Sequence, residues 1–139
     1  MKVCDLQFDE DLETSVFISA LKKKVRLVLS DDLEASEQEL TEEYKEKILQ
    51  FLEEISIWYD KTTVAVKQYA DNKYSIKDIS DSDIELMAIF ILFEQDEPDL
   101  FGLSYRTKFD VEHGCGIKLK GNDQQFEIGE IGCADVAFC

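Results

Sequence analysis

The chain has 139 residues, of which 45% are hydrophobic, and it carries a formal net charge of −16 at pH 7. This length and composition suit one compact domain with its own core, and they exclude a disordered or linker-rich chain. The excess of carboxylates repels nucleic acid and anionic membrane surfaces and favours a basic protein as partner.

The location predicted for the chain is cytoplasmic. Its most apolar run, Met87–Phe93, is much shorter than the roughly 20 residues that a membrane-spanning helix needs. The acidic N-terminal segment lacks the basic start and apolar core of a signal peptide. We therefore expect reduced thiols at all four cysteines, because the cytosol keeps thiols reduced; these are Cys4, Cys115, Cys133 and Cys139.

The first predicted elements are three short strands. Apolar residues alternate with polar residues in the segments 4–8 and 25–30, which is the period of a half-buried strand, and the mostly apolar segment 15–21 is also predicted to be a strand. Three consecutive lysines separate the second and third segments, so these two strands should form a hairpin.

A long helix is predicted next, over residues 41–70. Thr41 is a suitable N-cap, and the carboxylates of Glu42 and Glu43 lie in the first turn, where the helix dipole favours them. Apolar residues then recur at spacings of three and four, which indicates an amphipathic helix. Thr62 and Thr63 are poor helix formers, so a kink between 60 and 63 is compatible with this pattern.

Strands follow in the C-terminal half. The segment 84–93 is almost uniformly apolar, as in a central strand, and 101–109 has the clearest alternation in the chain. Two further strands are predicted over 115–120 and 125–129. The whole chain, 1–139, is therefore predicted to be one α+β domain, in which an antiparallel sheet of about six or seven strands is packed on one face by one long helix.

The first candidate site is the segment between the strands 101–109 and 115–120. It contains the only histidine, flanked by a carboxylate that could orient it and a thiol two residues later, and its members are Glu112, His113, Gly114, Cys115 and Gly116. Catalysis would need a further partner that the pattern does not supply. Glycines also suit a tight reversal, so a structural turn is the favoured interpretation and no catalytic residue is assigned.

Metal sites are not predicted. Cys115, Cys133 and Cys139 could join His113 in a zinc site, but the paired spacing typical of structural zinc sites is missing. The acidic runs do not match the calcium-binding loop of EF-hands. We therefore expect no cofactor and no metal.

The second candidate site is an aromatic surface on the predicted helix. Four aromatic residues at helical spacing are most simply core and rim residues; they are Trp58, Tyr59, Tyr69 and Tyr74. If Trp58 were exposed, it would suit a protein-binding hot spot, for which Trp58, Tyr59 and Glu54 are the candidates. The oligomeric state is left open by the sequence.

The C-terminal half resembles a group of small uncharacterised bacterial proteins. Their strands end in the pattern aromatic-x-x-Glu-His-Gly-x-Gly, which is present here over 109–116. The resemblance extends over most of the chain, but only the Glu-His-Gly-x-Gly part is specific. Phe109 stands where tryptophan is more usual, and Cys115 stands where an aliphatic residue is commoner.

Some of these proteins resemble immunity proteins of bacterial toxin systems. The resemblance thus implies a non-enzymatic, acidic protein-binding domain that neutralises a basic partner, which agrees with the charge. The alternative is a small hydrolase or metal-dependent enzyme centred on Glu112, His113 and Cys115.

Overall fold

The computed structural model describes residues 8, 13–29, 41–94, 97–122 and 125–137. The strand predicted over 4–8 falls outside these residues, apart from Phe8, which packs against the core. None of the helices among the described residues has the length and apolar character needed to cross a membrane.

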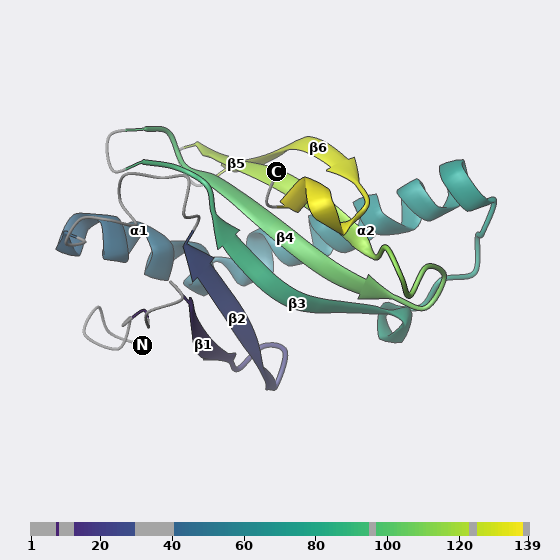
Figure 1. The fold of residues 1–139 in the computed structure, drawn as a ribbon, viewed down its shortest axis with the longest axis horizontal. Coiled ribbons are helices and arrows are strands. Elements are labelled where there is room, and N and C mark those ends of the chain that lie inside the picture. Colours follow the sequence, from purple (N-terminus) through teal and green to yellow (C-terminus); the bar gives the residue numbers. More distant parts are fainter. Residues whose placement is uncertain (1–7, 9–12, 30–40, 95–96, 123–124, 138–139) are drawn as a thin grey trace.

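The described residues form an α+β fold with a six-stranded sheet and two helices (Figure 1). Each of the other six predicted strands corresponds to an observed strand with bounds within a few residues. In chain order the elements are β1 (Glu13–Ile18), β2 (Lys23–Leu29), α1 (Glu42–Glu53), α2 (Ile55–Tyr74), η3 (Asp81–Asp83), β3 (Ile84–Ile91), β4 (Leu100–Thr107), β5 (Cys115–Asn122), β6 (Gln125–Gly132) and η4 (Ala134–Ala137).

The strands lie in the sheet in their sequence order, β1 to β6. Neighbours are antiparallel except β2 and β3, which run parallel. Antiparallel neighbours are joined by short connections, whereas the chain between β2 and β3 forms both helices before it returns to the sheet. The prediction of an antiparallel sheet is therefore correct for every pair but this one.

The predicted helix 41–70 is divided into two helices at Glu54, not near 60–63. In a continuous helix the carbonyl oxygen of Phe51 would accept from the N–H of residue 55. Here that oxygen accepts from the indole Nε1 of Trp58 at 2.8 Å. Thr62 and Thr63 lie inside α2 without breaking it, and each hydroxyl donates to a carbonyl oxygen three residues earlier in the helix.

Both helices cover one face of the sheet. The Phe51 ring of α1 stacks on Phe101 of β4 at 3.7 Å between centroids, and Thr62 of α2 meets the Tyr105 hydroxyl of the same strand at 2.6 Å. Figure 1 shows the two helices behind the sheet and η4 in front of it. We call the η4 side the outer face.

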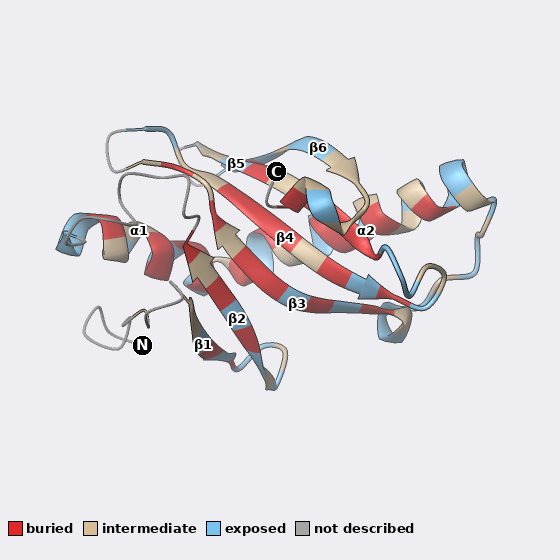
Figure 2. Cartoon of the chain, viewed as in Figure 1, coloured by how far each residue is buried: buried red, intermediate tan, exposed pale blue. Residues whose placement is uncertain are grey.

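On the outer face of β4, β5 and β6, three glycines leave room for the backbone of η4 to pack directly against the sheet. Gly102, Gly116 and Gly132 lie on these three strands, and the last two are register partners. A Cβ atom at Gly116 would approach the carbonyl oxygen of Cys133 to 2.7 Å, so the backbone of the C-terminal turn lies directly on the sheet. The backbone of Ala137 lies on Gly102 of β4 in the same way, so Gly102 is buried although it lies on the outer face. Figure 2 shows buried positions along β4 where η4 covers it.

Candidate functional site

The reversal between β4 and β5 is organised by Asp110. Its Oδ1 atom accepts from the backbone N–H of His113 at 3.1 Å and lies 3.0 Å from the Nδ1 atom of the same residue. Its carbonyl oxygen accepts from the N–H of Gly114 at 2.8 Å. Gly114 has a φ of 61°, a conformation that glycine adopts without strain. The signature segment is therefore a hydrogen-bonded turn.

Asp110 also attaches this turn to the end of α2. The Tyr74 hydroxyl donates to its Oδ2 atom at 2.5 Å, and the Tyr74 ring packs against Phe109 at 5.6 Å between centroids. The hydrogen bond from Tyr74 is the main cause that lowers the pKa of Asp110, with the bonds from His113 adding to it. Neither residue was assigned to the turn from the sequence. Tyr74 was predicted to be a core or rim residue, and Asp110 was not among the candidates, although an aspartate three residues before His113 is a common start for such a turn.

The five signature residues do not converge on one site. Glu112 and His113 are exposed, the histidine side chain by 65%, whereas Cys115 is fully buried in the core. Burial raises the pKa of the Cys115 thiol to about 12, so the thiol stays protonated at neutral pH. Gly114 and Gly116 are buried parts of the backbone. A nucleophile–base pair of Cys115 and His113 is therefore not formed.

An Asp110→Asn variant should lose stability in a pH-dependent manner. The pKa of Asp110 is lowered by folding, so its contribution is present above its ordinary value of 3.8 and disappears as the pH falls through the lower folded value. The difference in unfolding free energy between variant and parent should thus be largest near pH 6 and shrink below pH 4. Urea unfolding across this range measures it. The control is Glu112→Gln in the same turn, and an equally flat difference for both variants would contradict the prediction.

Of the three residues predicted to bind a partner, Trp58 is a core residue. It has no exposed area and stacks on Phe51 at 4.6 Å between ring centroids, with 3° between the ring planes. The simpler interpretation of Trp58 as a core residue is therefore correct, and the exposure that a hot spot at this position would need is absent. Tyr59 is half-buried, and Glu54 lies at the junction of the helices.

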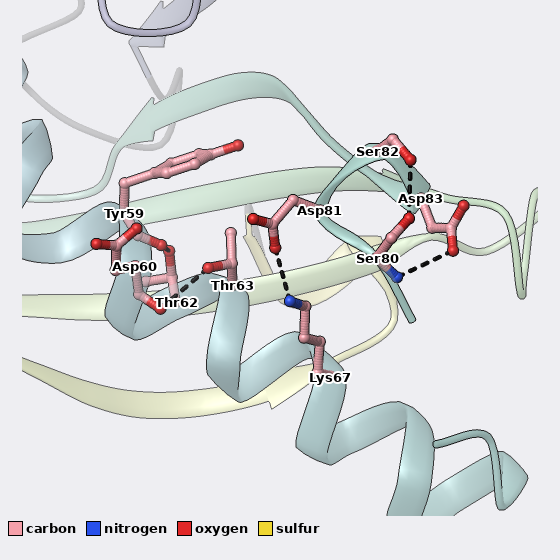
Figure 3. A network of polar contacts seen from close by, with 9 residues as sticks. All are labelled: Tyr59, Asp60, Thr62, Thr63, Lys67, Ser80, Asp81, Ser82 and Asp83. Atoms are coloured by element: carbon pink, nitrogen blue, oxygen red, sulfur yellow. Dashed lines mark hydrogen bonds and ion pairs between the residues drawn. The ribbon is translucent and has the colours of Figure 1, made fainter. Parts of the chain in front are cut away.

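Tyr59 lies beside a polar network that joins η3 to α2 (Figure 3). Burial raises the pKa of Tyr59, and the charges of Asp81, Asp60 and Glu85 add to this effect. Asp81 is already paired with Lys67 of α2 at 2.6 Å, and Asp83 caps η3 through the N–H of Ser80. Asp81 and Asp83 therefore already have partners, and their contacts stabilise the connection between α2 and β3.

Metal-binding clusters are not found in the part of the chain that the structure describes. No three His, Cys, Asp or Glu side chains gather there in a way that could hold an ion. Cys4 and Cys139 lie outside the described residues, so their relation to His113 stays untested.

A cleft of about 460 Å³ opens between α1, the loop before β4 and the β5–β6 hairpin. Its apolar wall is formed by three phenylalanines from α1, β4 and β6, and carboxylates stand around it. The lining residues are Lys47, Gln50, Phe51, Glu54, Glu97, Pro98, Asp99, Phe101, Gly121 and Phe126. We call this the acidic cleft.

The charge of the acidic cleft is only partly compensated. The Lys47 ammonium lies 3.7 Å from Asp99, while burial raises the pKa of Asp99 and the nearby charge of Glu54 adds to the rise. Glu54 accepts from the Gln50 amide at 3.0 Å, and Glu97 accepts from the backbone N–H of Glu94 at 2.7 Å. These two donors are neutral and leave the negative charge of Glu54 and Glu97 in place.

Sequence reasoning did not find the acidic cleft, although Glu54 was among its candidates. The cleft is made of segments far apart in the chain, near 50, 98 and 126. In the sequence, Glu97, Pro98 and Asp99 belong to an acidic stretch between the predicted strands 84–93 and 101–109, and no local pattern marks them as part of a site. Alternation and helical spacing describe each segment separately and do not report which segments meet.

Comparisons with known proteins do not add a relative. No family model matches the chain, and searches of curated proteins and of solved structures find no match.

Proposed function

We propose that this chain is a non-enzymatic protein-binding domain that recognises a basic partner through the acidic cleft. The observation that carries the proposal is the combination of a formal charge of −16 with carboxylates and phenylalanine rings around one hollow. A long-range negative field speeds the approach of a basic protein, and the cleft offers a specific place for one of its side chains.

Arginine or lysine is the side chain that suits this cleft. The carboxylates of Glu54 and Glu97 can accept from a guanidinium or ammonium group, and charge-assisted hydrogen bonds are among the strongest that proteins form. The edge of the Phe126 ring, which is 8% exposed, can contact the aliphatic stem of that side chain, while Phe51 and Phe101 are buried behind it. Lys47 remains paired with Asp99 in this arrangement.

Neutralisation of a basic toxin is the form of this function that the family resemblance implies. Covering the active site of such a toxin needs an acidic, rigid surface and no catalytic group. The proposal keeps the cytoplasmic location predicted from the sequence. The alternative enzyme centred on Glu112, His113 and Cys115 gains no support, because Cys115 is buried and His113 is exposed.

Titration of the full chain with a hexa-arginine peptide tests the cleft. We expect amide signals of Gln50, Glu54 and Glu97 to shift in NMR spectra, because these residues line the cleft. The double variant Glu54→Gln/Glu97→Gln should weaken binding about tenfold or more, since hydrogen bonds to charged groups contribute about 1.5–3 kcal/mol each.

The matched control is Asp71→Asn/Asp78→Asn, which removes the same charge at exposed positions outside the cleft. It should weaken binding less than about threefold, through the loss of long-range attraction alone. Equal losses in the two double variants would show that the peptide senses only net charge, and the proposed role of the cleft would then fail.

A further inference from the structure

Lys47 is the one cation among the described residues that line the acidic cleft. It lies on the same side of α1 as Gln50 and Glu54, which follow it by three and seven residues and also line the cleft. Its ammonium group is 3.7 Å from the Oδ1 atom of Asp99 and 5.9 Å from the centroid of the Phe93 ring. The chain therefore holds a cation of its own at one carboxylate of the cleft.

The loop between β3 and β4 brings several carboxylates close to this lysine. Burial raises the pKa of Tyr44, and the charges of Glu94, Glu97 and Asp99 add to the rise, so all three lie near its hydroxyl group. The loop is held in this position because the carbonyl oxygen of Asp99 accepts from the N–H of Gly121 at 3.1 Å. A single ammonium group beside Asp99 therefore compensates only part of this negative charge.

The pair of Lys47 and Asp99 is half-buried at the side of the cleft. The two side chains are 34% and 32% exposed. Burial raises the pKa of the Asp99 carboxyl, and the charge of Lys47 opposes this rise. Asp99 thus has a charged partner, whereas Glu54 and Glu97 accept from neutral donors. A cation that enters the cleft finds Asp99 already paired.

We propose that Lys47 restricts the acidic cleft to one basic side chain of the partner, because it occupies Asp99 and leaves only Glu54 and Glu97 to receive a cation. This inference rests on the proposed function and adds to it a residue that determines specificity. A second cation beside the first would approach the Lys47 ammonium, and like charges at contact distance repel each other. Without Lys47, the Asp99 carboxylate becomes a second acceptor for a charge-assisted hydrogen bond.

Two peptides that differ in one cation test this role. They are acetyl-Gly-Arg-Gly-Arg-Gly-amide and acetyl-Gly-Arg-Gly-Gln-Gly-amide, and side chains two residues apart in an extended peptide point to the same side. For the parent chain, the second arginine should raise affinity less than about threefold, through long-range attraction alone. For Lys47→Gln it should raise affinity about tenfold or more, because Asp99 then accepts from the second guanidinium. NMR titration of the full chain at low ionic strength measures the affinities.

The matched control is Lys45→Gln, which removes the same charge from α1 at a position that does not line the cleft. Lys47→Arg keeps the charge in place. Both variants should show the same small effect of the second arginine as the parent. A measurement without peptide checks the ion pair itself: the pKa of Asp99, from NMR titration of its carboxyl group, should be higher in Lys47→Gln than in the parent.

The inference is overturned if the second arginine contributes less than threefold in Lys47→Gln, or contributes equally in Lys47→Gln and Lys45→Gln. An unchanged pKa of Asp99 in Lys47→Gln would overturn it as well. In each of these cases the proposed function stands if the peptide with one arginine shifts the amide signals of Gln50 and Glu54. If neither peptide shifts these signals in the parent, the proposed function fails and the role of Lys47 fails with it.

Discussion

Replacing Trp58 with alanine should lower the free energy of unfolding by about 3–5 kcal/mol. The indole is fully buried between Phe51 and Tyr59, and its N–H satisfies the carbonyl oxygen of Phe51 where α1 ends. The substitution creates a cavity and leaves that oxygen without its donor. A domain is stabilised by about 5–15 kcal/mol in total, so the variant would stand close to unfolding at physiological temperature.

Urea unfolding followed by circular dichroism measures this effect. Trp58 is the only tryptophan, so fluorescence would be lost with the substitution. Trp58→Phe should cost less, about 1–3 kcal/mol, because a ring still fills much of the site while the hydrogen bond is absent. Ile57→Ala, at a position that is 49% exposed on the same helix, should cost under about 1 kcal/mol. A loss below 1 kcal/mol for Trp58→Ala would contradict the structure of this junction.

The strands and the inner faces of the helices can be predicted from the sequence, because the spacing of apolar residues differs between a strand and a helix. The alternation over 101–109 predicts which residues of β4 face the helices, and the spacing from Tyr44 to Leu52 predicts the inner face of α1. The parallel pairing of β2 with β3 could not be predicted in this way. Period 2 is the same in parallel and antiparallel strands, and the order of neighbours depends on where the helices return the chain.

The helix break and the candidate sites depend on contacts between distant residues. The break at Glu54 arises from an indole that competes for a backbone carbonyl, whereas the adjacent threonines, which are weak helix formers, lie inside α2 without interrupting it. The His113 turn was placed correctly between two strands, yet its organising residues, Asp110 and Tyr74, come from the turn itself and from the end of α2. No local pattern links these last two residues.

The second large effect is expected at Gly102, on the outer face of β4. A Cβ atom there would overlap the backbone carbonyl oxygen of Ala137, which cannot move without shifting η4. Gly102→Ala should therefore cost about 1–3 kcal/mol, the usual penalty for overfilling a packed site, and release η4 from the sheet. The matched control is Gly129→Ala on β6, where the nearest atom to the new Cβ atom is Cε of the flexible Lys120 side chain at 3.3 Å. Hydrogen exchange at Ala134–Ala137 should accelerate in the first variant only.

A chain without η4 shows whether Gly102→Ala is destabilising because of the clash with η4 or because of an effect of alanine in β4 that does not involve η4. In a chain shortened by residues 133–139, the clash partner is gone, so Gly102→Ala should become neutral or slightly stabilising. The shortened chain itself should be less stable than the parent, because the outer faces of Gly102, Gly116 and Gly132 lose their cover. If Gly102→Ala lowered the unfolding free energy by the same amount in both chains, η4 would not be packed on these three glycines. If Gly102→Ala lowers the unfolding free energy only in the full chain, the C-terminal turn is the reason why glycine is needed at this face of the sheet.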